Sequence, residues 1–131
     1  MIAADTSTWI AFFTGQAGDD VEMLAAGLRD RQLLMVPAVL TEIFSDSKLS
    51  TDVAAMLSQL PLIDTEPGYW QRAGELRARV LSKKRKARLG DALIAQSCLD
   101  REIPLVTRDR DFRAFAEAAG LNLVIGTTAK G

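Results

Sequence analysis

The chain of 131 residues contains no histidine. This absence excludes serine–histidine triads, histidine-ligated zinc and imidazole acid–base catalysis. There is a single cysteine, Cys98, so the chain has no internal disulfide framework and no cysteine metal site. Any chemistry of this protein must therefore use carboxylates, hydroxyls, lysine and arginine, together with a metal ion if one is bound.

Long apolar runs are also missing. No run approaches the roughly 20 residues that a membrane-spanning helix needs, and the N-terminus has neither the basic start nor the long apolar stretch of a secretory signal. We therefore expect a cytoplasmic protein without a membrane partner. With 48% hydrophobic residues, the sequence is typical of one globular domain, which we place at residues 1–125, followed by a flexible tail at 126–131.

Short apolar runs alternate along the chain with segments of helical spacing. This alternation predicts an α/β fold with a mainly parallel central sheet and helices on both faces. Strands are predicted at Ile2–Asp5, Leu33–Val36, Pro61–Asp64, Leu105–Thr107 and Asn122–Ile125. Helices are predicted at Thr8–Phe13, from Asp19 or Asp20 as cap to about Arg31, around Glu42, from Ser50, from Tyr69, from Asp91, and at Phe112–Ala119.

Aromatic residues make up only 6% of the chain, and several of them have helical spacing. In the long helix that begins near Tyr69, the pattern predicts an inward stripe that consists of Trp70, Ala73, Leu76 and Val80. We interpret Trp9 and Trp70 as core or dimer contacts in preference to base-stacking platforms.

Four acids are predicted at strand ends or on helices next to them. Asp5 ends the first strand, and Asp109 closely follows the strand 105–107. Asp91 opens a helix after Gly90, and Glu42 lies in the otherwise apolar helix after the strand 33–36. Because ligands bind outside the carboxyl ends of parallel strands, we expect these four acids to meet at that edge of the sheet.

Clustered carboxylates repel one another unless a cation neutralises them. An all-oxygen ligand set without histidine or cysteine suits a hard ion such as Mg²⁺ or Mn²⁺. Such an ion polarises a phosphoryl oxygen and lowers the pKa of a bound water, which removes the need for a histidine base. The acids therefore favour metal-dependent hydrolysis of phosphodiester bonds.

A basic segment of the chain is suited to bind a polyanionic substrate. Positions 72–88 contain eight of the sixteen basic residues and one acid, although the net charge of the chain is only −1. A local basic patch, and not the average charge, determines binding to nucleic acid. We predict RNA-binding cations at Lys83, Lys84, Arg85, Lys86 and Arg88; a solvated helix face is the alternative interpretation.

The same residues define a family resemblance that spans essentially the whole chain. Its motifs are Asp5-Thr6-Ser7, Glu42 on its helix, Gly90-Asp91-Ala92-Leu93-Ile94-Ala95 and Thr107-Arg108-Asp109-Arg110-Asp111-Phe112. In this order and spacing the motifs resemble those of PIN-domain ribonucleases, in particular the VapC-type toxins of toxin–antitoxin pairs. The resemblance implies a PIN-like three-layer fold and a metal-dependent endoribonuclease.

The resemblance also implies the roles of individual residues and the partners. Asp5, Glu42, Asp91 and Asp109 match the catalytic acids; we assign metal binding to Asp5, Asp91 and Asp109, with Glu42 bound directly or through water. Ser7, Thr107 and Asp111 match supporting positions. A homodimer and an inhibitory antitoxin protein are the partners that the resemblance implies.

Simpler interpretations exist for each acid and for the whole chain. Asp91, Asp109 and Asp111 are also ordinary helix-capping residues, and Glu42 is also compatible with a solvated stripe. A non-catalytic PIN-fold binding module and, less well, a phosphate-transfer domain are the competing functions. A phosphate-transfer domain requires an acidic pair or Asp-x-Asp after the first strand, where this chain has Asp5-Thr6-Ser7. DNA stays open as a substrate, because no feature here distinguishes a 2′-hydroxyl.

Overall fold

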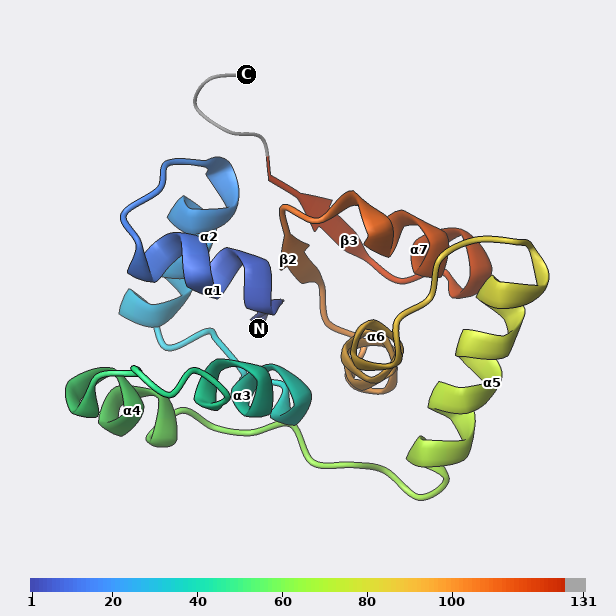
Figure 1. The fold of residues 1–131 in the computed structure, drawn as a ribbon, viewed down its shortest axis with the longest axis horizontal. Coiled ribbons are helices and arrows are strands. Elements are labelled where there is room, and N and C mark those ends of the chain that lie inside the picture. The colour runs from blue at the N-terminus through green and yellow to red at the C-terminus, as the bar shows by residue number, and fades with distance from the viewer. Residues whose placement is uncertain (127–131) are drawn as a thin grey trace.

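The structure, a computed structural model, describes residues 1–126 (Figure 1). Strands alternate with helices as predicted. The elements are β1 (Ala3–Ala4), α1 (Thr6–Phe13), α2 (Asp19–Arg29), α3 (Pro37–Phe44), α4 (Thr51–Ser58), α5 (Tyr69–Ser82), α6 (Leu89–Arg101), β2 (Leu105–Thr107), the 3₁₀ helix η1 (Arg110–Phe112), α7 (Arg113–Ala119) and β3 (Leu123–Ile125). Apart from Gly126, the predicted flexible tail at 126–131 lies outside the described residues. Over residues 1–126, no helix is long and apolar enough to cross a bilayer.

The central sheet has three parallel strands in the order β1-β2-β3. Two further predicted strands are present only as isolated parallel bridges, which pair Ile2 with Leu33 and Met35 with Leu62. Pro37 and Pro61 both lack an N–H donor, so the pairing of Met35 with Leu62 does not extend into a ladder at either end. The direction of both segments still matches the predicted parallel sheet.

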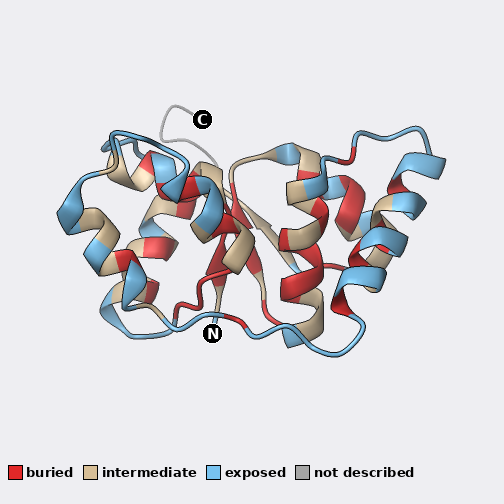
Figure 2. Ribbon diagram, turned by 60° about the horizontal axis from the view of Figure 1, so that its bottom comes forward, coloured by how far each residue is buried: buried red, intermediate tan, exposed pale blue. Residues whose placement is uncertain are grey.

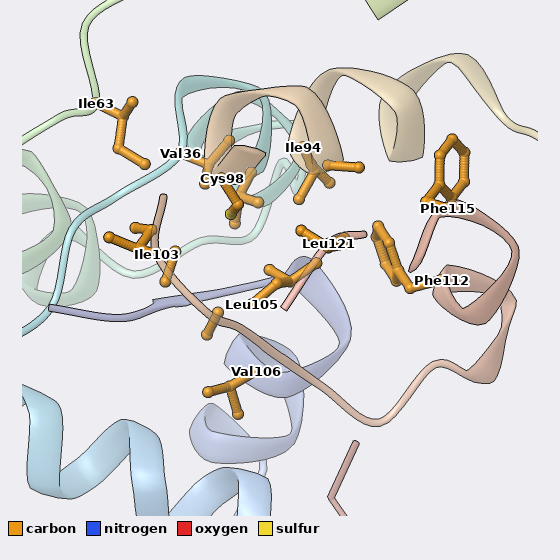
Figure 3. Packing of buried hydrophobic residues seen from close by; sticks show 14 of the residues in the cluster. Val36, Ile63, Ile94, Cys98, Ile103, Leu105, Val106, Phe112, Phe115 and Leu121 are labelled. Carbon is orange, nitrogen blue, oxygen red and sulfur yellow. The ribbon is translucent and has the colours of Figure 1, made fainter. Parts of the chain in front are cut away.

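Helices cover the strands on both sides, which confirms the predicted three-layer α/β fold (Figures 1 and 2). On one side α1 and α2 contact β2; on the other, α5 packs against α6 and α7. Because successive strand residues point to opposite faces, the buried Leu105 and Val106 of β2 contribute to both layers of the core. Figure 3 shows these two residues among Ile94 and Cys98 of α6 and Phe112, all of which belong to one cluster.

Two local predictions are wrong. The inward stripe of α5 begins at Tyr69, which is buried and donates its hydroxyl to the backbone oxygen of Leu93 at 2.7 Å. Trp70 faces outward instead, with 65% of its surface exposed. The cap of α2 is Gly18, so neither Asp19 nor Asp20 is the N-cap residue, and the buried Asp20 serves a different contact described below.

Candidate active site

Asp5 lies at the point where β1 ends and α1 begins. Its buried carboxylate caps α1 by accepting the backbone N–H of Thr8 at 3.1 Å. The Ser7 hydroxyl donates to both carboxylate oxygens, at 2.8 Å and 2.9 Å, and the Thr107 side chain is a further hydrogen-bond partner. Burial raises the pKa of Asp5, and these hydrogen bonds partly oppose that effect. Ser7 and Thr107 thus both contact Asp5.

Asp109 follows β2 and lies beside Asp5. Its backbone N–H donates to Thr107 Oγ1 at 2.9 Å, so a single hydroxyl contacts both Asp5 and the backbone of Asp109. The Asp109 carboxylate accepts the N–H of Asp111 at 2.9 Å and caps η1. The charge of Asp109 also contributes to the raised pKa of Asp5. The structure thus brings the acids at the ends of β1 and β2 within electrostatic reach of each other.

Asp91 occupies the first turn of α6, whose N-cap is Arg88. Burial is the main cause that raises the pKa of Asp91 to about 6, and the charge of Asp109 is the next. The charge of Arg88 opposes this shift, while the charges of Glu42 and Asp5 add to it. All three other predicted acids therefore act on Asp91, although they come from three separate parts of the chain.

Glu42 lies on the exposed side of α3 at the rim of the same region. Its Oε1 accepts the hydroxyl of Thr6 at 2.8 Å, which links α3 to the start of α1. A Cβ added to Gly90 would lie 3.8 Å from Glu42 Oε2, so Glu42 is also next to the residue that precedes Asp91. Glu42 is thus adjacent to both the Asp5 segment and the Asp91 segment.

The donor chemistry of these four acids fits a hard divalent cation, because every available ligand is a carboxylate or hydroxyl oxygen. The charge of Asp109 adds to the burial that raises the pKa of Asp5 and of Asp91, and a bound cation would relieve this repulsion. However, within residues 1–126, no three histidine, cysteine, aspartate or glutamate side chains are arranged closely enough to hold a metal ion. The acids are neighbours but do not form a closed ligand cage.

Among the remaining predicted site residues, Lys86 and Asp111 form an ion pair with each other. Lys86 Nζ lies 3.3 Å from Asp111 Oδ2, and Arg85 Nη1 lies 2.7 Å from an oxygen of Glu117. Two of the five cations predicted to bind RNA therefore form ion pairs with acids. The other three, Lys83, Lys84 and Arg88, are exposed.

The sequence interpretation missed two residues that are joined to these acids through Thr8 and through the backbone. Asp20, only 1% exposed, and Arg108, which separates Thr107 from Asp109, form a partly buried ion pair with an Nε–Oδ2 distance of 2.8 Å. Thr8 also donates its hydroxyl to Asp20 at 2.9 Å. The only local signal for Asp20 is an acid pair after a glycine loop, and it does not indicate a partner 88 positions away.

The fold and the site together define an α/β protein with neighbouring carboxylates at the carboxyl edge of a parallel sheet. Residues 2–118 match the model of the PIN domain family. The chain belongs to the PIN-domain family.

Individual relatives agree with this assignment. The chain is 27% identical over 126 residues to ribonuclease VapC5 of Mycobacterium tuberculosis, a match that covers 92% of this chain and 91% of that protein. Its fold is similar to two solved chains of toxin–antitoxin complexes. One, in DNA-bound VapBC from Salmonella typhimurium, has a TM-score of 0.72 at 19% identity and coverages of 95% and 96%. The other, in VapBC2 from Rickettsia felis bound to a promoter fragment, has a TM-score of 0.71 at 23% identity and coverages of 95% and 98%. The predicted resemblance to VapC-type PIN domains is thereby confirmed.

Proposed function

We propose that this chain is a Mg²⁺- or Mn²⁺-dependent endoribonuclease and the toxin of a toxin–antitoxin pair. The observation that supports this most directly is the environment of Asp91, whose pKa of about 6 reflects burial together with the charges of Asp109, Glu42 and Asp5. The capping roles of Asp5 and Asp109 do not explain why four acids from distant parts of the chain lie together at one edge of the sheet, where their charges repel. A cation that they share, and the phosphodiester that the cation binds, provide a reason.

In this proposal Asp5, Asp91 and Asp109 hold the cation, and Glu42 completes the set directly or through water. When bound, the divalent cation polarises a phosphoryl oxygen and lowers the pKa of a coordinated water. Ser7, Thr8 and Thr107 hold the Asp5 carboxylate in one orientation through their hydrogen bonds. With a pKa of about 6, Asp91 is mostly ionised at neutral pH and therefore available as a ligand. The exposed cations Lys83, Lys84 and Arg88 hold the RNA backbone beside the acids.

The proposed partners are an antitoxin protein and a second copy of this chain. Support for an antitoxin comes from the two solved chains above, which belong to VapBC complexes that are both bound to DNA. Support for a homodimer comes from the exposed Trp70 and Leu89, at 65% and 63% exposure, which line a common pocket with Ala38 and Leu93. Exposed apolar side chains that cluster in this way mark protein interfaces.

One observation favours a second candidate function. Because the described acids do not form a closed ligand cage, the chain is also compatible with a non-catalytic PIN-fold module that binds RNA or protein. The two candidates differ in whether the acids bind a cation, which makes metal dependence the deciding property.

The deciding experiment incubates the purified chain with total RNA and with labelled DNA in Mg²⁺ or Mn²⁺. Parallel reactions contain EDTA, the Asp5→Asn variant, or the matched variant Asp52→Asn, which removes an exposed acid from α4. We expect RNA cleavage that EDTA and Asp5→Asn abolish and Asp52→Asn leaves intact. A normally folded Asp5→Asn protein with full activity would contradict the catalytic proposal. If no RNA is cleaved, Mn²⁺ calorimetry on the same proteins distinguishes a chain that binds no cation from an intact nuclease whose target RNA is missing.

A further inference from the structure

The guanidinium group of Arg108 makes four hydrogen bonds, all of them to the segment between α1 and the first turn of α2. Its Nε and Nη2 atoms donate to the two carboxylate oxygens of Asp20, at 2.8 Å and 2.9 Å. Nη1 donates to the side chain of Gln16 at 3.0 Å, and Nη2 also donates to the backbone oxygen of Ala17 at 3.1 Å. The bidentate geometry fixes direction as well as distance, which a single ion contact does not.

This pair belongs to a ring of contacts that joins the ends of β1 and β2. Thr8 donates its hydroxyl to Asp20 and its backbone N–H to the carboxylate of Asp5. From Asp20 the ring passes to Arg108 and along the backbone to Thr107, whose side chain returns to Asp5. Thr8 and Thr107 contact the candidate ligand Asp5 directly, and Arg108 precedes the candidate ligand Asp109 in the chain. Asp20 reaches Asp5 through Thr8.

The end of β3 closes against the same ring. The backbone N–H of Gly126 donates to the backbone oxygen of Thr107 at 2.8 Å. A Cβ at Gly126 would lie 2.5 Å from Cβ of Asp20 and 2.7 Å from its backbone nitrogen, so a larger residue does not fit there without a shift. The carboxyl ends of all three strands thus meet at the Asp20–Arg108 pair.

Stability alone is a poor reason for such a pair. Asp20 is 1% exposed and the Arg108 side chain 17%, and a buried ion pair of this kind is typically no more stable than well-packed apolar residues. Burial raises the pKa of Asp20, but the hydrogen bonds from Arg108 and Thr8 and the charge of Arg108 together outweigh burial and lower it, so the pair remains ionised. What the pair provides is a fixed geometry between two strand ends.

We propose that Asp20 and Arg108 are positioning residues that set the placement of Asp5 relative to Asp109 for binding of a divalent cation. This inference rests on the proposed metal-dependent function. Neither residue touches the cation or the RNA in this proposal; they act through Thr8 and through the backbone on either side of Arg108. Residues that hold a metal ligand in place typically change metal affinity by about 10- to 100-fold when they are removed. Asp20 binds Thr8, which contacts the ligand Asp5, and Arg108 lies between Thr107 and Asp109 in the chain.

The test is Mn²⁺ calorimetry on the full chain with the variants Asp20→Asn and Arg108→Lys. A matched control is Arg72→Lys, because Arg72 forms a comparable side-chain pair with Asp100 between α5 and α6. We expect Mn²⁺ affinity to fall about 10- to 100-fold in the first two variants and to be unchanged in the control. Thermal unfolding of each variant shows whether the affinity change occurs in a folded protein.

A double variant protects the test against simple unfolding. Asp20→Leu combined with Arg108→Met removes both charges, so it leaves no unpaired ion in the interior. We expect this protein to unfold near the temperature of the original chain and to bind Mn²⁺ at least tenfold more weakly. Unchanged Mn²⁺ affinity in the folded variants overturns the positioning role and leaves the proposed function intact. Absence of Mn²⁺ binding by the unsubstituted chain overturns both.

Discussion

The ammonium group of Lys86 lies 3.3 Å from the carboxylate of Asp111, so two residues predicted for separate roles are neighbours. The sequence assigned Lys86 to RNA binding and Asp111 to support of the acids. Both side chains are substantially exposed, at 56% and 39%, and an ion pair of this kind contributes little to stability. Its main effect is to offset the charge of Lys86 beside the candidate site, which weakens the attraction of that cation for phosphate.

Substitution of Asp111 by asparagine is therefore expected to strengthen RNA binding. Removal of the acid releases the charge of Lys86, and the slope of log affinity against log salt is expected to steepen by about 1. Fluorescence anisotropy with labelled RNA in an Asp5→Asn background measures binding without cleavage. Glu117→Gln releases Arg85 in the same way, so it is expected to have a similar effect. Asp52→Asn is the matched control, because it removes an exposed acid of α4 outside the basic segment. Weaker binding by Asp111→Asn would indicate that Asp111 itself contacts the substrate or its cation.

Asp91 is expected to destabilise the metal-free protein at neutral pH. Its pKa rises to about 6 in the folded state from 3.8 in the unfolded chain, so the folded protein binds the extra proton. The destabilisation is complete above pH 6, decreases as the pH falls through that value, and is absent below 3.8. The shift corresponds to about 3 kcal/mol at most, which solvent screening of this partly exposed group reduces to about 1 kcal/mol.

Urea denaturation in EDTA tests this prediction with Asp91→Asn. At pH 8 we expect the variant to be more stable than the original chain by about 1 kcal/mol, and at pH 4 we expect most of the difference to disappear. Added Mn²⁺ is expected to stabilise the original chain and not the variant. Equal stability of the two proteins at both pH values would show that the neighbouring acids do not act on Asp91.

Trp70 is expected to hold two copies of the chain together. A charge placed among exposed apolar residues is costly once an interface covers them, so Trp70→Glu is expected to shift a dimer to monomers in analytical ultracentrifugation. Leu81→Glu is the control, since Leu81 is also an exposed apolar residue of α5, at 45% exposure, and lies near its other end. A monomeric original chain, or equal effects of the two variants, would argue against this surface as the dimer interface.

The parts of the site that the sequence predicted are those with a local signal. Asp5 and Asp109 follow short buried strands, and parallel strands place their carboxyl ends at one edge, so the fold alone predicts that these two acids meet. Glu42 was predicted from its apolar helix and from the family pattern. Its partner, the Thr6 hydroxyl, lies 36 positions away and has no pattern of its own.

Other features depend on packing that a single sequence does not specify. Tyr69 and Trp70 differ by one position and both have helical spacing to Ala73, so periodicity cannot decide which of them is buried. The hydrogen bond from Tyr69 to Leu93 on a different helix decides it. The Asp20–Arg108 pair is similar, because two charges that are usually exposed become buried only as partners across 88 positions.

Gly126 offers a way to disturb the three strand ends without changing any charge. Gly126→Ala places a Cβ 2.7 Å from the backbone nitrogen of Asp20, which cannot move as a flexible side chain can, so overpacking is expected to cost about 1–3 kcal/mol. Gly74→Ala is the opposite case, because a Cβ at this exposed position in α5 meets nothing within 4 Å and is expected to stabilise the helix by roughly 0.5–1 kcal/mol. Urea denaturation measures the change in the free energy of unfolding, which is expected to be negative for Gly126→Ala and positive for Gly74→Ala. Mn²⁺ calorimetry is expected to show weaker binding only for Gly126→Ala. A neutral effect of Gly126→Ala on both quantities would mean that the end of β3 yields easily and does not constrain Asp20.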